Sequence, residues 1–182
     1  MGKRRRITNE IIGEIAAIDS LAFTTNKCSD TARKVFTSAE NIEFDIWFNK
    51  HYYHRERHGD EYGKREGIEP DVVKNLIIAA ARHLIFYSIK VRSFSFVNFW
   101  ASMRNQRIIL TLKHQKGLNL NIVAEYHYLV LNRYEVTVIT AIRKDDFYFA
   151  EGEYQIRINM DGSSTLSRKI NGKIKLIDTF TT

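Results

Sequence analysis

The sequence has one cysteine among 182 residues, Cys28. A single thiol excludes an intrachain disulfide framework and any cysteine-built zinc site. Because structural disulfides belong to oxidising compartments, this composition fits a reducing compartment best. We therefore expect a cytoplasmic protein.

The sequence also lacks a continuous apolar run of about 18 residues, the length that crosses a bilayer. Its basic start at residues 3–6 is followed by an amphipathic stretch with Glu10 and Glu14, not by the apolar core of a signal peptide. These features predict a soluble, unprocessed protein that needs no membrane.

Acidic residues are too few to balance the basic ones. Lys and Arg number 28 against 21 Asp and Glu, which gives a net charge of +7 and a pI near 9.5. Such a balance favours polyanionic partners, nucleic acid first among them, through counterion release and long-range attraction. Many small proteins carry a similar charge without binding phosphate, so charge alone does not decide the function.

The N-terminal half is expected to be helical, behind a basic, frayed leader at residues 1–8. Apolar spacing predicts a short amphipathic helix over residues 9–18 and a second helix over 29–40. The only proline, Pro70, precedes a third and better supported helix over 71–84. Residues 42–47 fit a strand or a helix, and the charged stretch 50–67 must lie on the surface.

The sequence after His83 alternates β-branched and aromatic residues with polar ones, which is typical of strands. The expected strands cover residues 84–88, 93–99, 107–113, 120–131, 134–143, 147–149, 154–159 and 173–177. In this order along the chain, helices come first and a meandering sheet follows. The order predicts an α+β protein, with N-terminal helices packed on a C-terminal antiparallel β-sheet. At this length we expect a single domain over residues 1–182.

The segment HYYHRERHG carries three of the six histidines. In a helix, His51, His54, Arg55, His58 and Arg65 would share one face. Imidazoles can move protons near neutral pH and guanidinium groups bind phosphate, as metal-free cleavage of RNA requires. A solvated charged helix is the plain alternative. A metal site is a further one, although no cysteine joins the cluster and the arginines would repel a cation.

A second candidate group comes from the strand NIVAEYHYLV, where alternation places Glu125 and His127 on one face. They could be an acid/base pair, or they could simply lie on the solvent-exposed face of a half-buried strand. The remaining candidates would hold substrate, either by contacting phosphate or, for Tyr87, by stacking on an unpaired base. They are Arg57, Arg65, Tyr87, Lys113, Thr140, Arg143 and Lys144.

The motifs NKHYYHRERHG, REGIEP and YEVTVITAIRKDDF together resemble the RelE-like ribonucleases, including the phage RegB endoribonuclease, and the wider barnase/colicin-like toxin fold. His51 and Arg55 match the H-x-x-x-R spacing of that group, and residues 65–68 read REGI. The resemblance covers residues 49–145 and extends to the phage-borne branch. It implies cleavage of messenger RNA by 2′-hydroxyl attack without a cofactor, and a ribosome or an antitoxin as partner.

Two functions therefore stand after the sequence. The first is a metal-independent endoribonuclease in which His54 or His58 moves protons, Arg55 and Arg57 hold the phosphate, and Glu125 with His127 completes the acid/base pair. The second is a non-catalytic basic protein that binds nucleic acid or an acidic host protein. Replacing His54 and His58 by Ala separates the two: an enzyme would lose its activity, whereas a binding protein would lose only modest affinity and would respond mainly to changes of Lys and Arg.

Overall fold

The structure is a computed structural model, and it describes residues 23–37, 42–50, 52–53, 68–99, 105–115 and 117–181. The leader and the helix expected over residues 9–18 lie outside these ranges. So do six of the candidate site residues: His51, His54, Arg55, Arg57, His58 and Arg65.

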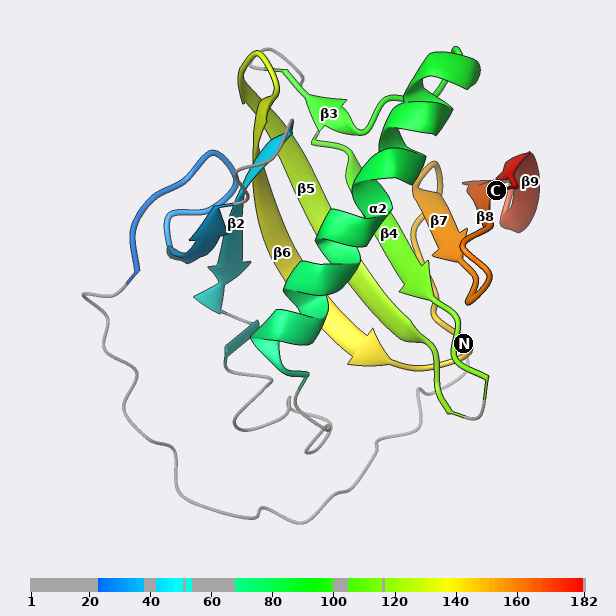
Figure 1. The fold of residues 1–182 in the computed structure, drawn as a ribbon, viewed down its shortest axis with the longest axis horizontal. Coiled ribbons are helices and arrows are strands. Elements are labelled where there is room, and N and C mark those ends of the chain that lie inside the picture. Colours follow the sequence, from blue (N-terminus) through cyan, green and yellow to red (C-terminus); the bar gives the residue numbers. More distant parts are fainter. Residues whose placement is uncertain are drawn as a thin grey trace.

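The described residues form one nine-stranded sheet and one long helix that lies across it (Figure 1). The strands are β1 (Ala32–Thr37), β2 (Glu43–Asn49), β3 (Val97–Asn98), β4 (Arg107–Leu112), β5 (Leu120–Val130), β6 (Arg133–Arg143), β7 (Tyr154–Ile158), β8 (Ser164–Ile170) and β9 (Lys173–Phe180). Their order is β1-β2-β6-β5-β4-β7-β8-β9, with β3 paired to β5. The sheet is mixed, because β2–β6, β4–β7 and β3–β5 pair in parallel.

The expected arrangement of N-terminal helices on an antiparallel sheet is therefore wrong. Residues 32–37, inside the helix expected over 29–40, form strand β1, which pairs antiparallel with β2. Strand β2 in turn pairs in parallel with β6, from a distant part of the sequence. Local helix propensity amounts to fractions of a kcal/mol per residue, and such long-range pairing overrides it. The same pairing resolves the ambiguous residues 42–47 as a strand.

Helix α2 (Pro70–Lys90) begins at the single proline, as expected, but runs further than expected. Residues 84–88, which we expected to form a strand, are its last turns. The apolar stripe continues through them at helical spacing. The buried positions are Val73, Leu76, Ile77, Ala80, His83, Leu84 and Tyr87.

By length and composition alone, α2 could cross a membrane, with a mean hydropathy of 1.4 over an 18-residue window. Charged residues interrupt its apolar run, which is why the sequence showed no continuous one. Its buried stripe packs against the sheet in the main core. A soluble core helix has this same composition, so α2 is weak support for a membrane span.

The turns and strands after α2 follow the sequence in part. Strand β5 ends in a turn at Asn132, whose φ is 60°, before β6 begins. The expected strand over 93–99 shrinks to the two residues of β3, and residues 147–149 form none. Strand β8 was not expected. It is a polar strand whose pairing with β7 and β9 is a tertiary feature.

Candidate functional site

The sheet face opposite α2 carries a row of buried polar side chains. Along β5, Leu120, Ile122, Ala124 and Tyr126 pack into the main core beneath α2, so alternate residues face the other way. The buried polar residues on that second face include Asp45, Thr111, Asn121, Glu125, His127, Glu135, Thr137 and Gln155. Buried polar groups need partners, and their partners define the site.

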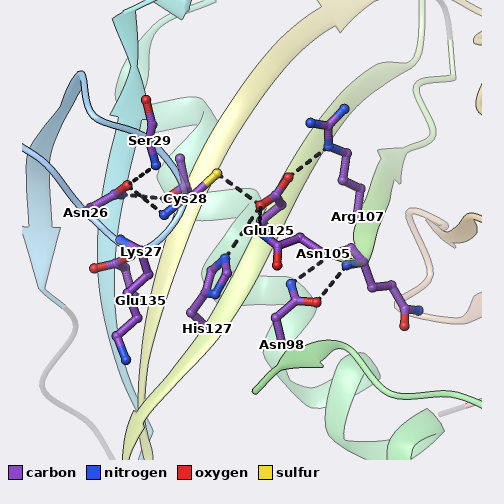
Figure 2. A network of polar contacts seen from close by, with 12 residues as sticks. Asn26, Lys27, Cys28, Ser29, Asn98, Asn105, Arg107, Glu125, His127 and Glu135 are labelled. Atoms are coloured by element: carbon purple, nitrogen blue, oxygen red, sulfur yellow. Dashed lines mark hydrogen bonds and ion pairs between the residues drawn. The ribbon is translucent and has the colours of Figure 1, made fainter. Parts of the chain in front are cut away.

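The Glu125 carboxylate is the centre of this network (Figure 2). Its Oε1 accepts a 2.9 Å hydrogen bond from Arg107 Nε. Its Oε2 accepts from Cys28 Sγ at 3.0 Å and from Asn105 Nδ2 at 3.1 Å, and lies 3.5 Å from His127 Nε2. Four side chains from three parts of the chain thus converge on one carboxylate.

These contacts decide the charge of Glu125. Burial by itself would raise its pKa, but hydrogen bonds from His127, Cys28 and Arg107 and the charge of Arg107 together lower the pKa to about 2. The carboxylate is therefore ionised across the physiological range. The same hydrogen bond raises the pKa of Arg107, so this pair is a permanent ion pair.

Cys28 is held over the carboxylate by a short turn. The side-chain oxygen of Asn26 accepts hydrogen bonds from the backbone amides of Cys28 and Ser29. The side-chain nitrogen of Asn26, Nδ2, donates to Thr137 Oγ1 on β6. Burial, the hydrogen bond to Glu125 and the negative charge of Glu125 raise the pKa of Cys28 from 9.0 to about 12. Cys28 is thus a neutral thiol that donates to the carboxylate.

Glu135 fixes the same segment from the neighbouring strand. Its Oε1 accepts a 2.7 Å bond from the backbone amide of Lys27, and the Lys27 ammonium donates to the Tyr128 carbonyl at 3.1 Å. Burial raises the pKa of Glu135. The segment 26–29 is therefore anchored at both β5 and β6, directly above Glu125 and His127.

The predicted pair of Glu125 and His127 does lie on one face, and the structure brings the two side chains within 3.5 Å of each other. Lys113, Arg143 and Lys144 gather elsewhere, where β4 ends, β5 begins and β6 ends. Leu120, which pairs with Arg143, is five positions along β5 from Glu125, a distance of roughly 17 Å.

Tyr87 lies on the opposite side of the sheet. Tyr87 belongs to α2, and its ring is fully buried between the helix and the sheet. Its hydroxyl is 2.9 Å from Ser164 Oγ. In this structure the ring has no face free to stack on a base.

Thr140 owes its position to a β-bulge. The register between β5 and β6 shifts so that Val123 pairs with Thr140 and Ala124 with Val138. Thr140 therefore shares the polar face with Val123, where strict alternation placed it on the other face. Ala141, expected on the polar face, packs against the main core instead.

Sequence reasoning missed Cys28, Asn105 and Arg107 as members of this site. Arg107 begins a strand that was expected, but nothing in the sequence indicated that it pairs opposite Glu125. Cys28 and Asn105 come from irregular segments, whose placement depends on the finished sheet.

Comparisons with protein-family models, with curated proteins and with solved structures found no match. The resemblance to RelE-like ribonucleases therefore rests on the motifs quoted above.

Proposed function

We propose that this protein is a metal-independent endoribonuclease that cleaves single-stranded or messenger RNA by attack of the 2′-hydroxyl. The observation that carries the proposal is the grouping of a carboxylate, an imidazole and a guanidinium on one sheet face: Glu125, His127 and Arg107. Transesterification of RNA needs a base, an acid and a cation at the phosphate, and these three groups supply them.

The charges assign the roles. Glu125 is ionised at neutral pH, since its pKa lies near 2, and it can accept the proton of the 2′-hydroxyl. His127 would then donate a proton to the departing 5′-oxygen, and Arg107 would stabilise the charge that develops on the phosphorus. A carboxylate with so low a pKa is a weak base, so correct placement must contribute much of the rate.

Access to the pair requires a movement of the covering segment. Glu125 is 2% exposed and His127 6%, whereas the Arg107 side chain is 49% exposed. Residues 26–29 lie over the carboxylate through the bonds of Asn26, Lys27 and Cys28 described above. RNA would first meet Arg107 and reach Glu125 once this segment swings away.

The cations at the far end of the sheet fit a longer substrate. Lys113, Arg143 and Lys144 lie roughly 17 Å along the sheet from Glu125, too far to touch the phosphate that reacts. They suit phosphates several nucleotides away on the same strand. The histidine-rich segment would add further cations, and a ribosome or antitoxin remains the partner that the resemblance implies.

One observation favours the alternative, a non-catalytic basic binding protein for nucleic acid or an acidic host protein. The carboxylate and the imidazole are both buried, as in a structural polar network that never meets a substrate. Such a protein would bind RNA through its exposed Lys and Arg residues and leave it intact.

The test is incubation of the purified chain with end-labelled single-stranded RNA in excess EDTA, followed by analysis of the product ends. An enzyme of this kind yields 2′,3′-cyclic phosphate ends. Glu125→Gln and His127→Gln should each lower the rate about 100-fold or more, the usual range for losing an acid or base. A His51/His54/His58 triple-Ala variant tests whether these three histidines, which lie outside the described residues, also contribute to the cleavage rate.

The matched control is His114→Gln, which changes an exposed histidine in the loop after β4. It should cleave at the rate of the unmodified chain. RNA that is retarded on a gel and never cut would replace the ribonuclease with the binding protein. Equal rates for all variants would show that a contaminating nuclease cut the RNA.

A further inference from the structure

The three side chains above Glu125 also have the chemistry of a metal site. Cys28 Sγ, a Glu125 oxygen and a His127 ring nitrogen all lie within 4.8 Å of one another, and among the described residues no other such group occurs. The Cys28 Sγ to Glu125 Oε2 distance is 3.0 Å, and His127 Nε2 lies 3.5 Å from the same oxygen. Tetrahedral zinc bonds of 2.0–2.3 Å place neighbouring ligand atoms roughly 3.4–3.6 Å apart. Small side-chain adjustments would therefore suffice.

A second, independent observation comes from His127. Its Nε2 atom is buried, and its contact with Glu125 Oε2, at 3.5 Å, is longer and weaker than an ordinary hydrogen bond. A buried ring nitrogen with so weak a hydrogen bond is costly, and a metal ion would satisfy it. The nitrogen points toward the Glu125 carboxylate, beside the thiol (Figure 2).

We propose that Cys28, Glu125 and His127 bind a zinc-like transition-metal ion. A thiolate, an imidazole and a carboxylate suit Zn²⁺ and disfavour Mg²⁺ and Ca²⁺, which take oxygen ligands. Three protein ligands leave a fourth position for water. The sequence excluded a site built from cysteines, but this one needs only a single cysteine.

The surrounding side chains fit an occupied site. Arg107 donates to Oε1 of Glu125 and Asn105 donates to Oε2, and such bonds orient a carboxylate ligand. The metal would take the place of the Cys28 hydrogen bond at Oε2. Binding replaces the S–H bond of Cys28 by a sulfur–metal bond and releases one proton to solvent. The positive charge of Arg107 opposes the ion, but its side chain is half exposed and its charge is partly screened by water.

Occupancy would have a consequence for the proposed ribonuclease, and this consequence alone rests on the proposed function. The ion would take up both Glu125 and His127, so neither could transfer a proton to or from RNA. It would also tie segment 26–29 to β5 through Cys28. Zinc should therefore inhibit cleavage, and EDTA should restore it.

The test of binding uses Co²⁺ as a spectroscopic substitute for Zn²⁺, added to the metal-free full chain in a reductant that contains no thiol. Because Cys28 is the only cysteine, a sulfur-to-cobalt charge-transfer band can come only from this site. The band should saturate at one Co²⁺ per chain and vanish when Zn²⁺ is added. Histidines elsewhere in the chain, including those at residues 51–58, cannot produce it.

Variants then distinguish a site with three ligands from metal binding by the Cys28 thiol alone. Cys28→Ser should abolish the band, and Glu125→Gln and His127→Gln should each weaken cobalt binding at least about tenfold. His114→Gln should leave it unchanged. No band with the unmodified chain, or a band that Glu125→Gln and His127→Gln leave at full affinity, would overturn the proposal.

A measurement on the unmodified chain guards against variants that fail to fold. X-ray absorption of the zinc-loaded chain should show one sulfur near 2.3 Å and nitrogen or oxygen ligands near 2.0–2.1 Å. A shell with no sulfur would refute the site. Since none of these experiments contains RNA, their outcome is independent of cleavage in EDTA, and either proposal can fail alone.

Discussion

At the scale of the residue, the notable feature is a buried carboxylate held ionised by its neighbours. Glu125 receives hydrogen bonds from Arg107, Cys28 and Asn105, so the cost of burying its charge is offset by several donors. Such a network is stable only while its members are present, because a lost partner leaves a buried charge less well compensated.

Arg107→Met should therefore destabilise the protein. We expect a loss of about 1–3 kcal/mol in the free energy of unfolding, below the cost of breaking a fully buried pair, because the arginine is half exposed and Glu125 keeps other donors. Urea unfolding at neutral pH measures it. Arg157→Met, at an exposed position on β7, is the control and should change stability by less than about 0.5 kcal/mol.

His83 predicts a pH dependence of stability. It is fully buried, its Nδ1 lies 2.9 Å from Ser164 Oγ, and its Nε2 accepts from Arg82 Nε. Burial and the charge of Arg82 lower its pKa from 6.5 to about 4. Between these two pH values the unfolded chain binds the proton more tightly, so stability is present above pH 6.5 and is lost as the pH falls toward 4.

The expected loss is about 3 kcal/mol, from 1.36 kcal/mol for each unit of pKa difference. Urea unfolding at several pH values should show it, and His83→Gln should flatten the slope in this window whatever its effect on stability at neutral pH. An unchanged slope would mean that another group titrates there.

Among the secondary-structure elements, α2 shows how well the spacing of apolar residues predicts where a helix ends. The helix was predicted to end near His83, because β-branched and aromatic residues follow. Tertiary packing extends it to Lys90, since Leu84 and Tyr87 continue the buried stripe. Residue type alone was ambiguous there, and the helical spacing of the buried residues was the better guide.

Leu84→Ala should cost about 2–5 kcal/mol, the usual range for a fully buried leucine, whose side chain here lies beneath the helix. Ile89→Ala, five residues later and 80% exposed, should cost less than about 0.5 kcal/mol. Thermal and urea unfolding compare the two. Equal losses at both positions would contradict a helix that continues to Lys90.

The bulge in β6 shows that a residue pattern can also fail in strands, where it decides which face a side chain occupies. Simple alternation assigned Glu125 and His127 correctly because β5 is regular between them, and it failed for Thr140 and Ala141 because the register shifts just before them. A single extra residue reverses the faces of all that follow, and the sequence carries no clear signal for it.

At the scale of the whole molecule, the sheet has two covered faces. Helix α2 covers one face, and the segment around Cys28 covers part of the other through Thr137, Glu135 and Glu125. The covering segment is held mainly by hydrogen bonds, so it should open more easily than the core under α2.

This difference can be measured through the thiol. Cys28 should react slowly with a thiol reagent in the native protein, because the reactive thiolate is scarce when the pKa is about 12. Asn26→Ala removes the bonds that shape the turn, and the reaction rate should rise about tenfold or more while the unfolding midpoint changes little. A rate unaffected by Asn26→Ala would show that the turn does not control access to Glu125.

Composition and local pattern were enough to predict the basic charge, the start of α2 at Pro70, the strands β4 to β7, most of β9 and the shared face of Glu125 and His127. These features depend on composition and on short-range periodicity, which a linear pattern records. Contacts between distant parts of the chain make residues 32–37 a strand, make the sheet mixed, and bring Cys28, Asn105 and Arg107 together at Glu125. Those contacts join residues up to 97 positions apart, and their stability comes from partners that local sequence does not contain.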